Sequence, residues 1–193
     1  MAKVLVVYHS ASGHIAQLAQ SVAVGARAVK GTHVDVRRIP ESNGAVDGDD
    51  TPYAAPNDLI DYDAVIFGTP SHFGNMSAAM RTFMDQTSGL WMRRALVGKL
   101  AGVFVGTSSQ HGGHETTVQS FHTTLLHHGM ILVGVPYTCD ALNVVDTVEG
   151  GSPYGAGTIT GIAGRTGPSE IEKAVAKFQG HHIAEIASRL FPS

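Results

Sequence analysis

The sequence predicts an α/β fold in which a doubly wound, five-stranded parallel sheet of order 2-1-3-4-5 carries helices on both faces. Five strand-like segments recur along the chain, and four of them are near-continuous apolar runs. Such runs are typical of parallel strands that are buried on both faces. Segments with a helical spacing of apolar residues lie between the strands, and this alternation indicates right-handed βαβ units.

Each element of this fold has its own signal. The expected strands are VLVVY at 4–8, HVDVRRI at 33–39, AVIFGT at 64–69, AGVFVGT at 101–107 and MILVGV at 130–135. Helical stripes are formed by Ile15, Leu18, Ala19, Val22, Ala23 and Ala26, by Met76, Met80, Phe83 and Met84, and by Val118, Phe121 and Leu125. The methionines of the second stripe are expected in a core or an interface. A last helix is expected from about Ser169, with an interruption near Gly180.

Two segments depart from the alternating pattern. Residues 40–57 are rich in Pro, Gly and Asp, so the crossover from the second to the third strand is expected to be mostly loop, with one helical turn near Leu59. Residues 136–168 contain EGGSPYGAGTITGIAGRTGP and are expected to be poorly structured, and a loop of this length in a compact domain is more often functional than accidental. We therefore expect a single domain, 1–193, with a long loop insertion at about 136–168.

Composition excludes several function classes. Charged residues make up only 15% of the 193 residues, below the usual quarter, which indicates an uncharged surface suited to subunit interfaces. The formal charge of -3, without a basic stripe, argues against a nucleic-acid partner. The single Cys139 excludes an internal disulfide and an iron-sulfur cluster, and it fits a reducing cytoplasm. No apolar run is long enough for a signal peptide or a membrane span, so a cytoplasmic protein without membrane insertion is expected.

The topology fixes where a ligand is expected. In a doubly wound sheet of this order, ligands bind beyond the carboxyl ends of the strands, between the first and third strands. The loops at that edge are SASGHI (10–15), TPSHFGNM (69–76) and TSSQHGGH (107–114). All three are rich in small polar residues and glycine, and each leads into a helix.

The first loop suits a phosphate, although it is neither a dinucleotide turn nor a nucleotide-triphosphate loop, because it has one glycine and no lysine. Backbone N–H groups, the hydroxyls of Ser10 and Ser12 and the positive end of the following helix would hold the anion. The alternative is that Ser10 or Ser12 is only the N-cap of the helix.

The other two loops suit a flat ring. Pro70 ends the third strand, and Gly74-Asn75 permits a tight turn that presents amide groups to a ring edge, although an ordinary strand-to-helix turn would look similar. In the third loop Gly112 and Gly113 allow close backbone approach. A phosphate site beside an amide-rich neighbourhood indicates flavin mononucleotide (FMN). The candidate cofactor-binding residues are Ser10, Ala11, Ser12, Gly13, His14 and Ile15; Thr69, Pro70, Ser71, His72, Phe73, Gly74 and Asn75; and Gly106, Thr107, Ser108, Ser109, Gln110, His111, Gly112 and Gly113.

Eleven histidines raise the question of a metal site. The candidates are His111-x-x-His114, His122, His127-His128 and His181-His182. A zinc site needs three or four convergent ligands, whereas adjacent histidines on a helix point about 100° apart. We therefore predict no metal site.

The strings SASGHI, IFGTPSHFGNMSAAMRTFMDQTSGLW, GKLAGVF, TTLLHHGMILVG and GGSPYGAGTITG together resemble the WrbA family of flavodoxin-like NAD(P)H:quinone oxidoreductases over essentially the whole chain. The resemblance implies FMN held by the three loops, with His128 beside the flavin and Trp91 as a wall of the pocket where quinone and nicotinamide alternate. It also implies a homotetramer built from dimers. This chain departs from the pattern at Ser12, where the family often has an aromatic residue, and in the loop TSSQHGG.

The expected function is FMN-dependent, two-electron reduction of quinones to hydroquinones by NADH or NADPH in a ping-pong cycle. The alternatives are a flavodoxin-type one-electron carrier, which would call for an acidic docking surface, and a regulatory or scaffold flavoprotein. Helix length adds a further expectation. A helix from near Ser77 to about Ser88 spans roughly 18 Å and carries the chain to the far edge of the sheet. Trp91 and His128 are the candidate catalytic residues, and a neighbouring subunit is expected to supply Trp91.

Overall fold

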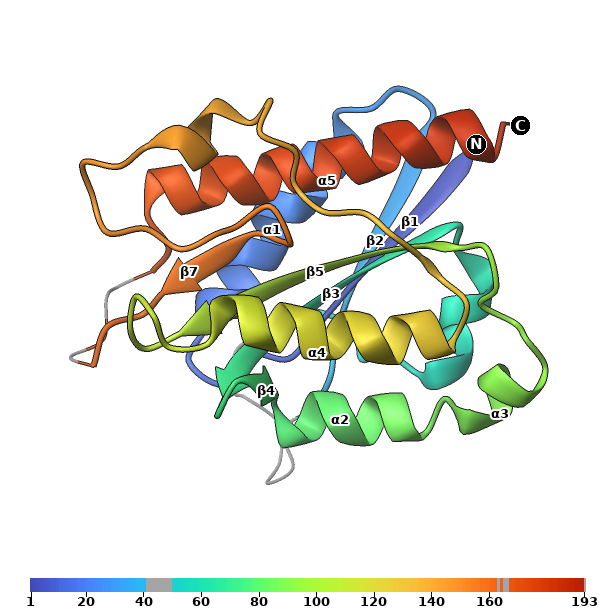
Figure 1. The fold of residues 1–193 in the computed structure, drawn as a ribbon. Helices are drawn as coiled ribbons and strands as arrows, with labels where there is room; N and C mark the ends of the chain where they lie inside the picture. The colour runs from blue at the N-terminus through green and yellow to red at the C-terminus, as the bar shows by residue number, and fades with distance from the viewer. Residues whose placement is uncertain (41–49, 163, 165–166, 193) are drawn as a thin grey trace.

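A central parallel sheet organises the chain, and the computed structural model describes residues 1–40, 50–162, 164 and 167–192 (Figure 1). The strands are β1 (Ala2–Tyr8), β2 (Thr32–Arg38), β3 (Ala64–His72), β4 (Asn75–Met76), β5 (Leu100–Thr107), β6 (Ile131–Leu132) and β7 (Gly157–Ile159). The helices are α1 (His14–Arg27), α2 (Ala78–Asp85), α3 (Ser88–Met92), α4 (His114–His127) and α5 (Glu170–Leu190), with short 3-10 helices η1 (Pro56–Asp61) and η2 (Asp140–Asn143).

The strand order β2-β1-β3-β5-β6 confirms the predicted doubly wound fold. Val4 pairs with Val34 on one side and Ala64 on the other, and Ala64 pairs with Leu100, all in parallel. The fifth strand is shorter than predicted, because only Ile131–Leu132 of the segment 130–135 pair with β5. Farther along β5, β7 takes the place beside Val105–Thr107.

Two apolar cores cover the two faces of the sheet, since alternate residues of each strand point to opposite sides. Val4 and Val6 face α1 and α5, whereas Leu5 and Val7 face α2 and α4. Figure 1 shows the same division, with α1 and α5 on one side of the sheet and α2, α3 and α4 on the other. The methionines of the predicted stripe, Met76, Met80 and Met84, are buried in the second core.

The last helix corrects one prediction, because α5 is continuous through Gly180. A Cβ atom on Gly180 would lie 1.9 Å from the carbonyl oxygen of Val22 on α1. The glycine therefore marks a close helix crossing rather than a break. None of the described helices is long and apolar enough to cross a membrane.

Of the two irregular segments, the crossover before β3 matches the prediction, whereas the segment 136–168 has more structure than predicted. Within the predicted loop 40–57, residues 41–49 lie outside the described part of the chain, and the helical turn near Leu59 is confirmed as η1. The segment 136–168 is not a structureless insertion, because it contains η2 and β7, and Ala156, Thr158 and Ile159 are buried. Its residues 163, 165 and 166 lie outside the described residues.

Candidate functional site

The three predicted loops meet at the carboxyl edge of the sheet. His9, just before the first loop, donates its amide to the carbonyl of Gly68 at 2.9 Å. The second and third loops are in contact, since a Cβ atom on Gly113 would lie 3.1 Å from the Cα atom of Gly74. The hydroxyls of Ser71 and Thr117 are 2.7 Å apart. The structure thus brings together all three segments that the sequence singled out.

The first loop presents a row of backbone donors. Gly13 is the N-cap of α1 with a φ of 83°, and no side chain caps the helix from that position. The hydroxyl of Ser10 accepts a hydrogen bond from the amide of Ala16 at 3.2 Å. Ser10 thus satisfies one donor in the first turn of α1, as an N-cap side chain would. Among the described residues, the amides of residues 11–15 have no hydrogen-bond acceptor. Five successive donors at the positive end of a helix form a cradle that suits a phosphate.

The second loop is a β-hairpin rather than a direct turn into a helix. Ser71 pairs with Met76 and His72 with Asn75, which leaves Phe73 and Gly74 as the two turn residues. Both have positive φ values, 53° and 76°, as type I′ turns require. The turn is therefore one residue earlier than the predicted Gly74-Asn75. The turn leaves the Phe73 side chain fully exposed at this edge of the sheet, and a non-glycine residue in this conformation is strained.

The third loop is exposed along its middle and anchored at its two buried ends. Residues 108–112 are exposed, whereas Thr107 and His114 at its two ends are buried. The hydroxyl of Thr107 donates to the carbonyl of Ser109 at 2.7 Å. Burial lowers the pKa of His114 below the ordinary value of 6.5, so its ring is neutral at pH 7. Nε2 of His114 donates to the carbonyl of Thr158 at 3.1 Å.

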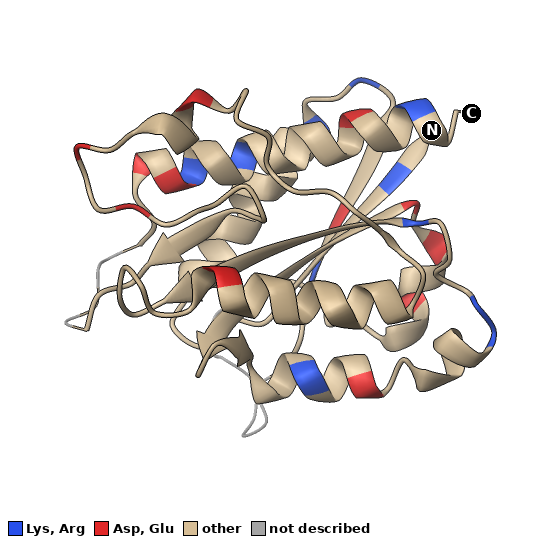
Figure 2. Cartoon of the chain, in the orientation of Figure 1, with Lys and Arg blue, Asp and Glu red and all other residues tan. Residues whose placement is uncertain are grey.

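The three loops contain no Lys, Arg, Asp or Glu, and Figure 2 shows β4 and the turn after β3 in tan. Within these loops, an anion would be held by amide and hydroxyl dipoles and by the positive end of α1. Among the described residues, no three His, Cys, Asp or Glu side chains lie close enough together to hold a metal ion.

Trp91 and His128 lie at the opposite end of the molecule. α4 begins at the third loop and has 14 residues, so it carries the chain roughly 21 Å before His128. Figure 1 shows α3 and the end of α4 together, far from β4 and β7. There a cavity of about 550 Å³ is lined by Arg81, Met84, Asp85, Thr87, Ser88, Trp91, Thr123, Thr124, His127 and His128. One chain therefore does not bring these two residues to its own three loops.

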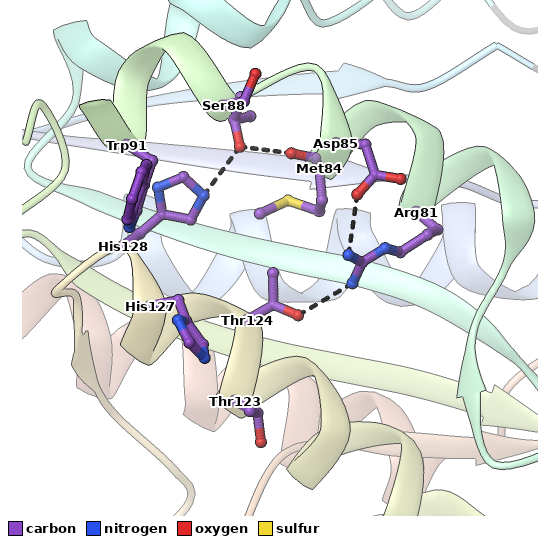
Figure 3. A pocket seen from close by; sticks show the side chains of 10 residues that line it. Arg81, Met84, Asp85, Ser88, Trp91, Thr123, Thr124, His127 and His128 are labelled. Carbon is purple, nitrogen blue, oxygen red and sulfur yellow. Dashed lines mark hydrogen bonds and ion pairs between the residues drawn. The ribbon is translucent and has the colours of Figure 1, made fainter. Parts of the chain in front are cut away.

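The walls of this cavity come from α2, α3 and α4 (Figure 3). Arg81 pairs with Asp85 at 2.9 Å and donates to Thr124 at 3.4 Å. The Trp91 side chain is 55% exposed, whereas His128 is buried. Burial, with a smaller contribution from the neighbouring His127, lowers the pKa of His128. The cavity thus offers an exposed aromatic wall beside a neutral imidazole.

The sequence pattern does not reveal the support behind the third loop. His114 closes that loop and is also a metal-ligand candidate by residue type, but nothing local shows that it contacts β7, and β7 lies within the segment 136–168 that is expected to be loop. The string TIT at 158–160 is the available signal, since three successive β-branched residues favour a strand. Glu172 gave no signal beyond its place in the S-x-x-E pattern of a capping box.

Comparisons with known proteins agree with this architecture. A family model described as NADPH-dependent FMN reductase matches residues 2–140. A protein of Chromohalobacter salexigens named NAD(P)H dehydrogenase (quinone) is 53% identical and covers 98% of this chain and 99% of its own length. A protein of the same name from Acidithiobacillus ferrooxidans is 50% identical, with 99% of this chain and 100% of that protein covered.

Solved structures support the fold alone. A crystal structure described as the flavodoxin, WrbA-like protein from Agrobacterium tumefaciens has a TM-score of 0.72 at 23% identity and covers 98% of this chain and 99% of that chain. Oxidised Flavodoxin 1 from Bacillus cereus has a TM-score of 0.65 at 17% identity, with 95% and 98% covered. The fold is therefore flavodoxin-like. From the family match over most of its length and from relatives about half identical end to end, the chain belongs to the NADPH-dependent FMN reductase family.

Proposed function

We propose that the chain is an NAD(P)H:quinone oxidoreductase that uses FMN. The observation that carries the proposal is the cradle of amides at residues 11–15, which lies where two further polar loops converge on the carboxyl edge of the sheet. The family match and the names of the full-length relatives support the same activity.

The residues present fit FMN. The amides of the first loop and the hydroxyls of Ser10 and Ser12 would hold its phosphate. The hairpin turn at Phe73-Gly74 and the segment 106–113, which includes most of the third loop, would hold the ring, with amide groups at its edge. When bound, FMN supplies the hydride chemistry, and the protein supplies position and electrostatics.

A second subunit completes the proposed site. Trp91 and His128 lie roughly 20 Å from the loops of their own chain, so they meet a flavin only if another copy presents its cavity. The exposed Trp91 and Met92 beside that cavity, together with the low charge of the chain, support such an assembly. We propose a homotetramer in which each flavin faces the cavity of a neighbouring subunit.

The proposed cycle is ping-pong. The nicotinamide and the quinone are both flat rings and would use the same face of the flavin against Trp91, so one must leave before the other enters. In this arrangement Trp91 bounds the ring, and the buried, neutral His128 forms part of the cavity wall beside it. The cavity at the opposite end of the chain is large enough for one such ring.

The cofactor and the reaction are tested together. The purified protein is expected to be yellow, and heating is expected to release a flavin that co-migrates with an FMN standard. NADH or NADPH is then expected to bleach the 450 nm band, and benzoquinone to restore it without a paramagnetic signal. Release of FAD, absence of any flavin, or an accumulating radical during turnover would each contradict the proposal.

A further inference from the structure

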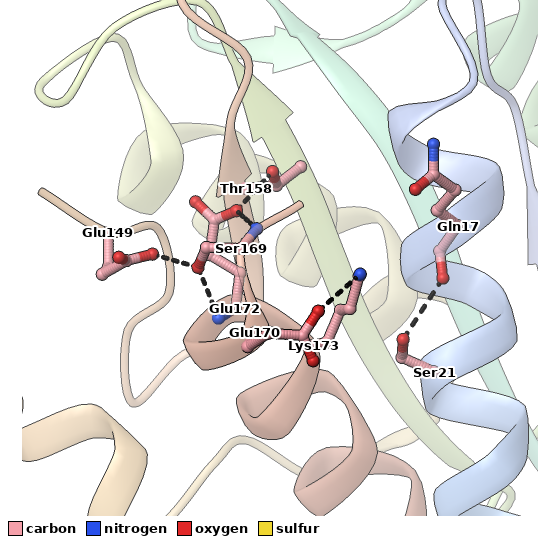
Figure 4. A network of polar contacts seen from close by, with 8 residues as sticks. All are labelled: Gln17, Ser21, Glu149, Thr158, Ser169, Glu170, Glu172 and Lys173. Carbon is pink, nitrogen blue, oxygen red and sulfur yellow. Dashed lines mark hydrogen bonds and ion pairs between the residues drawn. The ribbon is translucent and has the colours of Figure 1, made fainter. Parts of the chain in front are cut away.

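Glu172 is a buried carboxylate with an unusually complete set of partners. It lies in the first turn of α5 and has no exposed surface. Oε1 accepts the amides of Gly150 and Ile159 at 3.0 and 2.8 Å. Oε2 accepts the hydroxyl of Thr158 at 2.8 Å and the amide of Ser169 at 2.9 Å. Figure 4 shows this carboxylate between Thr158 and Ser169.

Helix capping explains only one of these four contacts. In a capping box the glutamate accepts the N-cap amide, here that of Ser169. The other three donors come from the glycine-rich segment 150–159. Burial of a carboxylate costs free energy unless it is hydrogen-bonded. Glu172 therefore needs the donors of this segment, and the segment is held in place by Glu172. Glu172 therefore anchors β7 to the start of α5.

β7 in turn contacts the helix that follows the third loop. The carbonyl of Thr158 accepts Nε2 of His114 at 3.1 Å. A Cβ atom on Gly157 would lie 2.8 Å from Cδ2 and 2.9 Å from Nε2 of His114. The imidazole is thus packed directly against the backbone of β7, and only glycine at 157 leaves room for it.

The same imidazole reaches the start of the third loop. Nδ1 of His114 lies 3.3 Å from the hydroxyl of Thr107, and that hydroxyl donates to the carbonyl of Ser109 at 2.7 Å. Thr160, just after β7, donates its amide to the carbonyl of Thr107 at 2.8 Å. Contacts therefore run from Glu172 to the backbone of the loop: hydrogen bonds join Glu172, Thr158 and His114, and the imidazole then packs against the hydroxyl of Thr107, which holds Ser109.

We propose that Glu172, Thr158 and His114 are positioning residues that hold the third loop in the conformation that binds FMN. The proposal rests on the proposed function, because it assumes that this loop contacts the flavin. The exposed loop residues 108–112 contribute little packing of their own, so their conformation depends on the two buried ends, Thr107 and His114. Precise loop sites in general need such a supporting layer.

The test compares this network with a matched contact on the same helix. Gln179 is also fully buried on α5, donates to the carbonyl of Val103 at 3.0 Å and accepts the amide of Ala156 at 3.2 Å. It therefore ties α5 to the same segment without a link to His114. The variants are Glu172→Gln, His114→Phe, Thr158→Val and Thr158→Ser, with Gln179→Leu as the control. FMN affinity of the apoprotein and its thermal midpoint are measured for each.

We expect Glu172→Gln, His114→Phe and Thr158→Val each to weaken FMN binding about tenfold, as the loss of one well-placed hydrogen bond does. Thr158→Ser keeps the hydroxyl and should restore affinity to within about twofold. Gln179→Leu should lower the thermal midpoint as much as Thr158→Val while changing FMN affinity less than about twofold. Amide hydrogen exchange in residues 107–113 of the apoprotein should be faster in His114→Phe and unchanged in Gln179→Leu.

The result that overturns the proposal is FMN affinity that follows thermal stability alone, with Gln179→Leu as weak as Thr158→Val, or affinity that stays at the wild-type value in Thr158→Val and His114→Phe. If Glu172→Gln fails to fold, the Thr158 pair and the hydrogen-exchange comparison still decide. A wild-type protein that binds no FMN would instead refute the proposed function. In that case hydrogen exchange alone would report whether the network orders the loop.

Discussion

At the residue scale, the hydroxyl of Thr87 lies 2.6 Å from the carbonyl oxygen of Met84 and 2.9 Å from Nε2 of His128. A hydroxyl has one proton, and a carbonyl oxygen can only accept, so Thr87 donates to Met84. Thr87 must therefore accept a hydrogen bond from Nε2–H of His128. Because burial lowers the pKa of His128, the ring is neutral at pH 7, and Nδ1 is left as the acceptor. Nδ1 is buried and, within the described residues, has no partner.

This geometry predicts the tautomer of His128. Nitrogen-15 NMR of the ring at pH 7.5 is expected to show Nε2 protonated and Nδ1 unprotonated. Thr87→Val removes the acceptor and should populate both tautomers, whereas Thr87→Ser keeps the hydroxyl and should preserve the wild-type spectrum. A wild-type ring protonated on Nδ1 would mean that Thr87 donates to His128 instead of to Met84.

At the element scale, α1 and α5 cross at two glycines. A Cβ atom on Gly25 of α1 would lie 1.8 Å from the carbonyl oxygen of Lys177, and one on Gly180 of α5 would lie 1.9 Å from that of Val22. Each helix thus approaches the other through a position without a side chain. Because the obstructing atoms belong to backbones, a methyl group at either position forces the helices apart.

Alanine is expected to destabilise the protein at the crossing and to stabilise it at an open helical glycine. Gly180→Ala should lower the free energy of unfolding by about 2–3 kcal/mol, because overpacking moves the backbone. Gly89→Ala, in α3, meets nothing within 4 Å and should raise it by about 0.5–1 kcal/mol, since alanine favours helix and reduces the freedom of the unfolded chain. Urea unfolding measures both. Equal free energies of unfolding for Gly180→Ala and the wild type would mean that α1 and α5 are farther apart at this position than in the structure.

The same elements show how far the sequence could be interpreted. The buried strands are predictable as apolar runs, because both of their faces are covered by helices. The three loops followed from strand order, which fixes the edge where ligands bind. The sequence pattern wrongly predicts an interruption at Gly180, because a glycine required by a neighbouring helix looks the same in sequence as one that ends a helix. No local pattern predicts where β7 lies, because its three residues pair with β5 and bind Glu172, which are distant in the chain.

The segments that form the candidate site are predictable from the sequence, but their detailed geometry is not. Loop composition pointed to Ser10–Ile15, Thr69–Asn75 and Gly106–Gly113, and the structure brings these segments together. The position of the hairpin turn at Phe73 was not predictable, because a non-glycine residue with positive φ goes against local preference. The chain of contacts from Glu172 to the third loop joins residues far apart in sequence, so no local pattern could reveal it.

At the scale of the whole molecule, buried histidines make stability depend on pH. Burial is the largest cause that lowers the pKa of His114, His122, His128 and His182 below the ordinary value of 6.5. In the unfolded chain these groups bind protons near pH 6.5, whereas in the folded chain they do so only at lower pH. Stability is therefore constant with respect to these groups above about pH 7.5 and falls as the pH drops below 6.5.

The predicted measurement is the urea midpoint between pH 8 and pH 5. We expect a plateau above pH 7.5 and a progressive decrease below 6.5. His122→Leu should flatten this decrease, because Nε2 of His122 is buried without a partner among the described residues. A midpoint that rises on acidification would show that these histidines are charged in the folded state.

The assembly is also a property of the whole molecule, and it determines what Trp91 does. Trp91 and Met92 expose apolar surface beside the cavity at the end of α2, α3 and α4, and the helices that separate this cavity from the three loops are too long for one chain to bridge the gap. Trp91→Ala should therefore impair quinone turnover about tenfold or more while leaving FMN affinity nearly intact. Trp91→Phe keeps an aromatic wall and should retain most of the turnover.

Dissociation of the oligomer should have the same effect as Trp91→Ala, because a separated subunit keeps its three loops but loses the cavity of its neighbour. The FMN-loaded protein is diluted in steps, and mass and quinone reductase activity are measured in parallel. We expect activity to fall along with the fraction of assembled protein, with the flavin still bound to the monomer through the amides of the first loop. Trp91→Ala, diluted in the same way, should show little further loss, because it already lacks the wall that assembly supplies. A monomer that retains full activity would refute the shared pocket and would require Trp91 to act within its own chain.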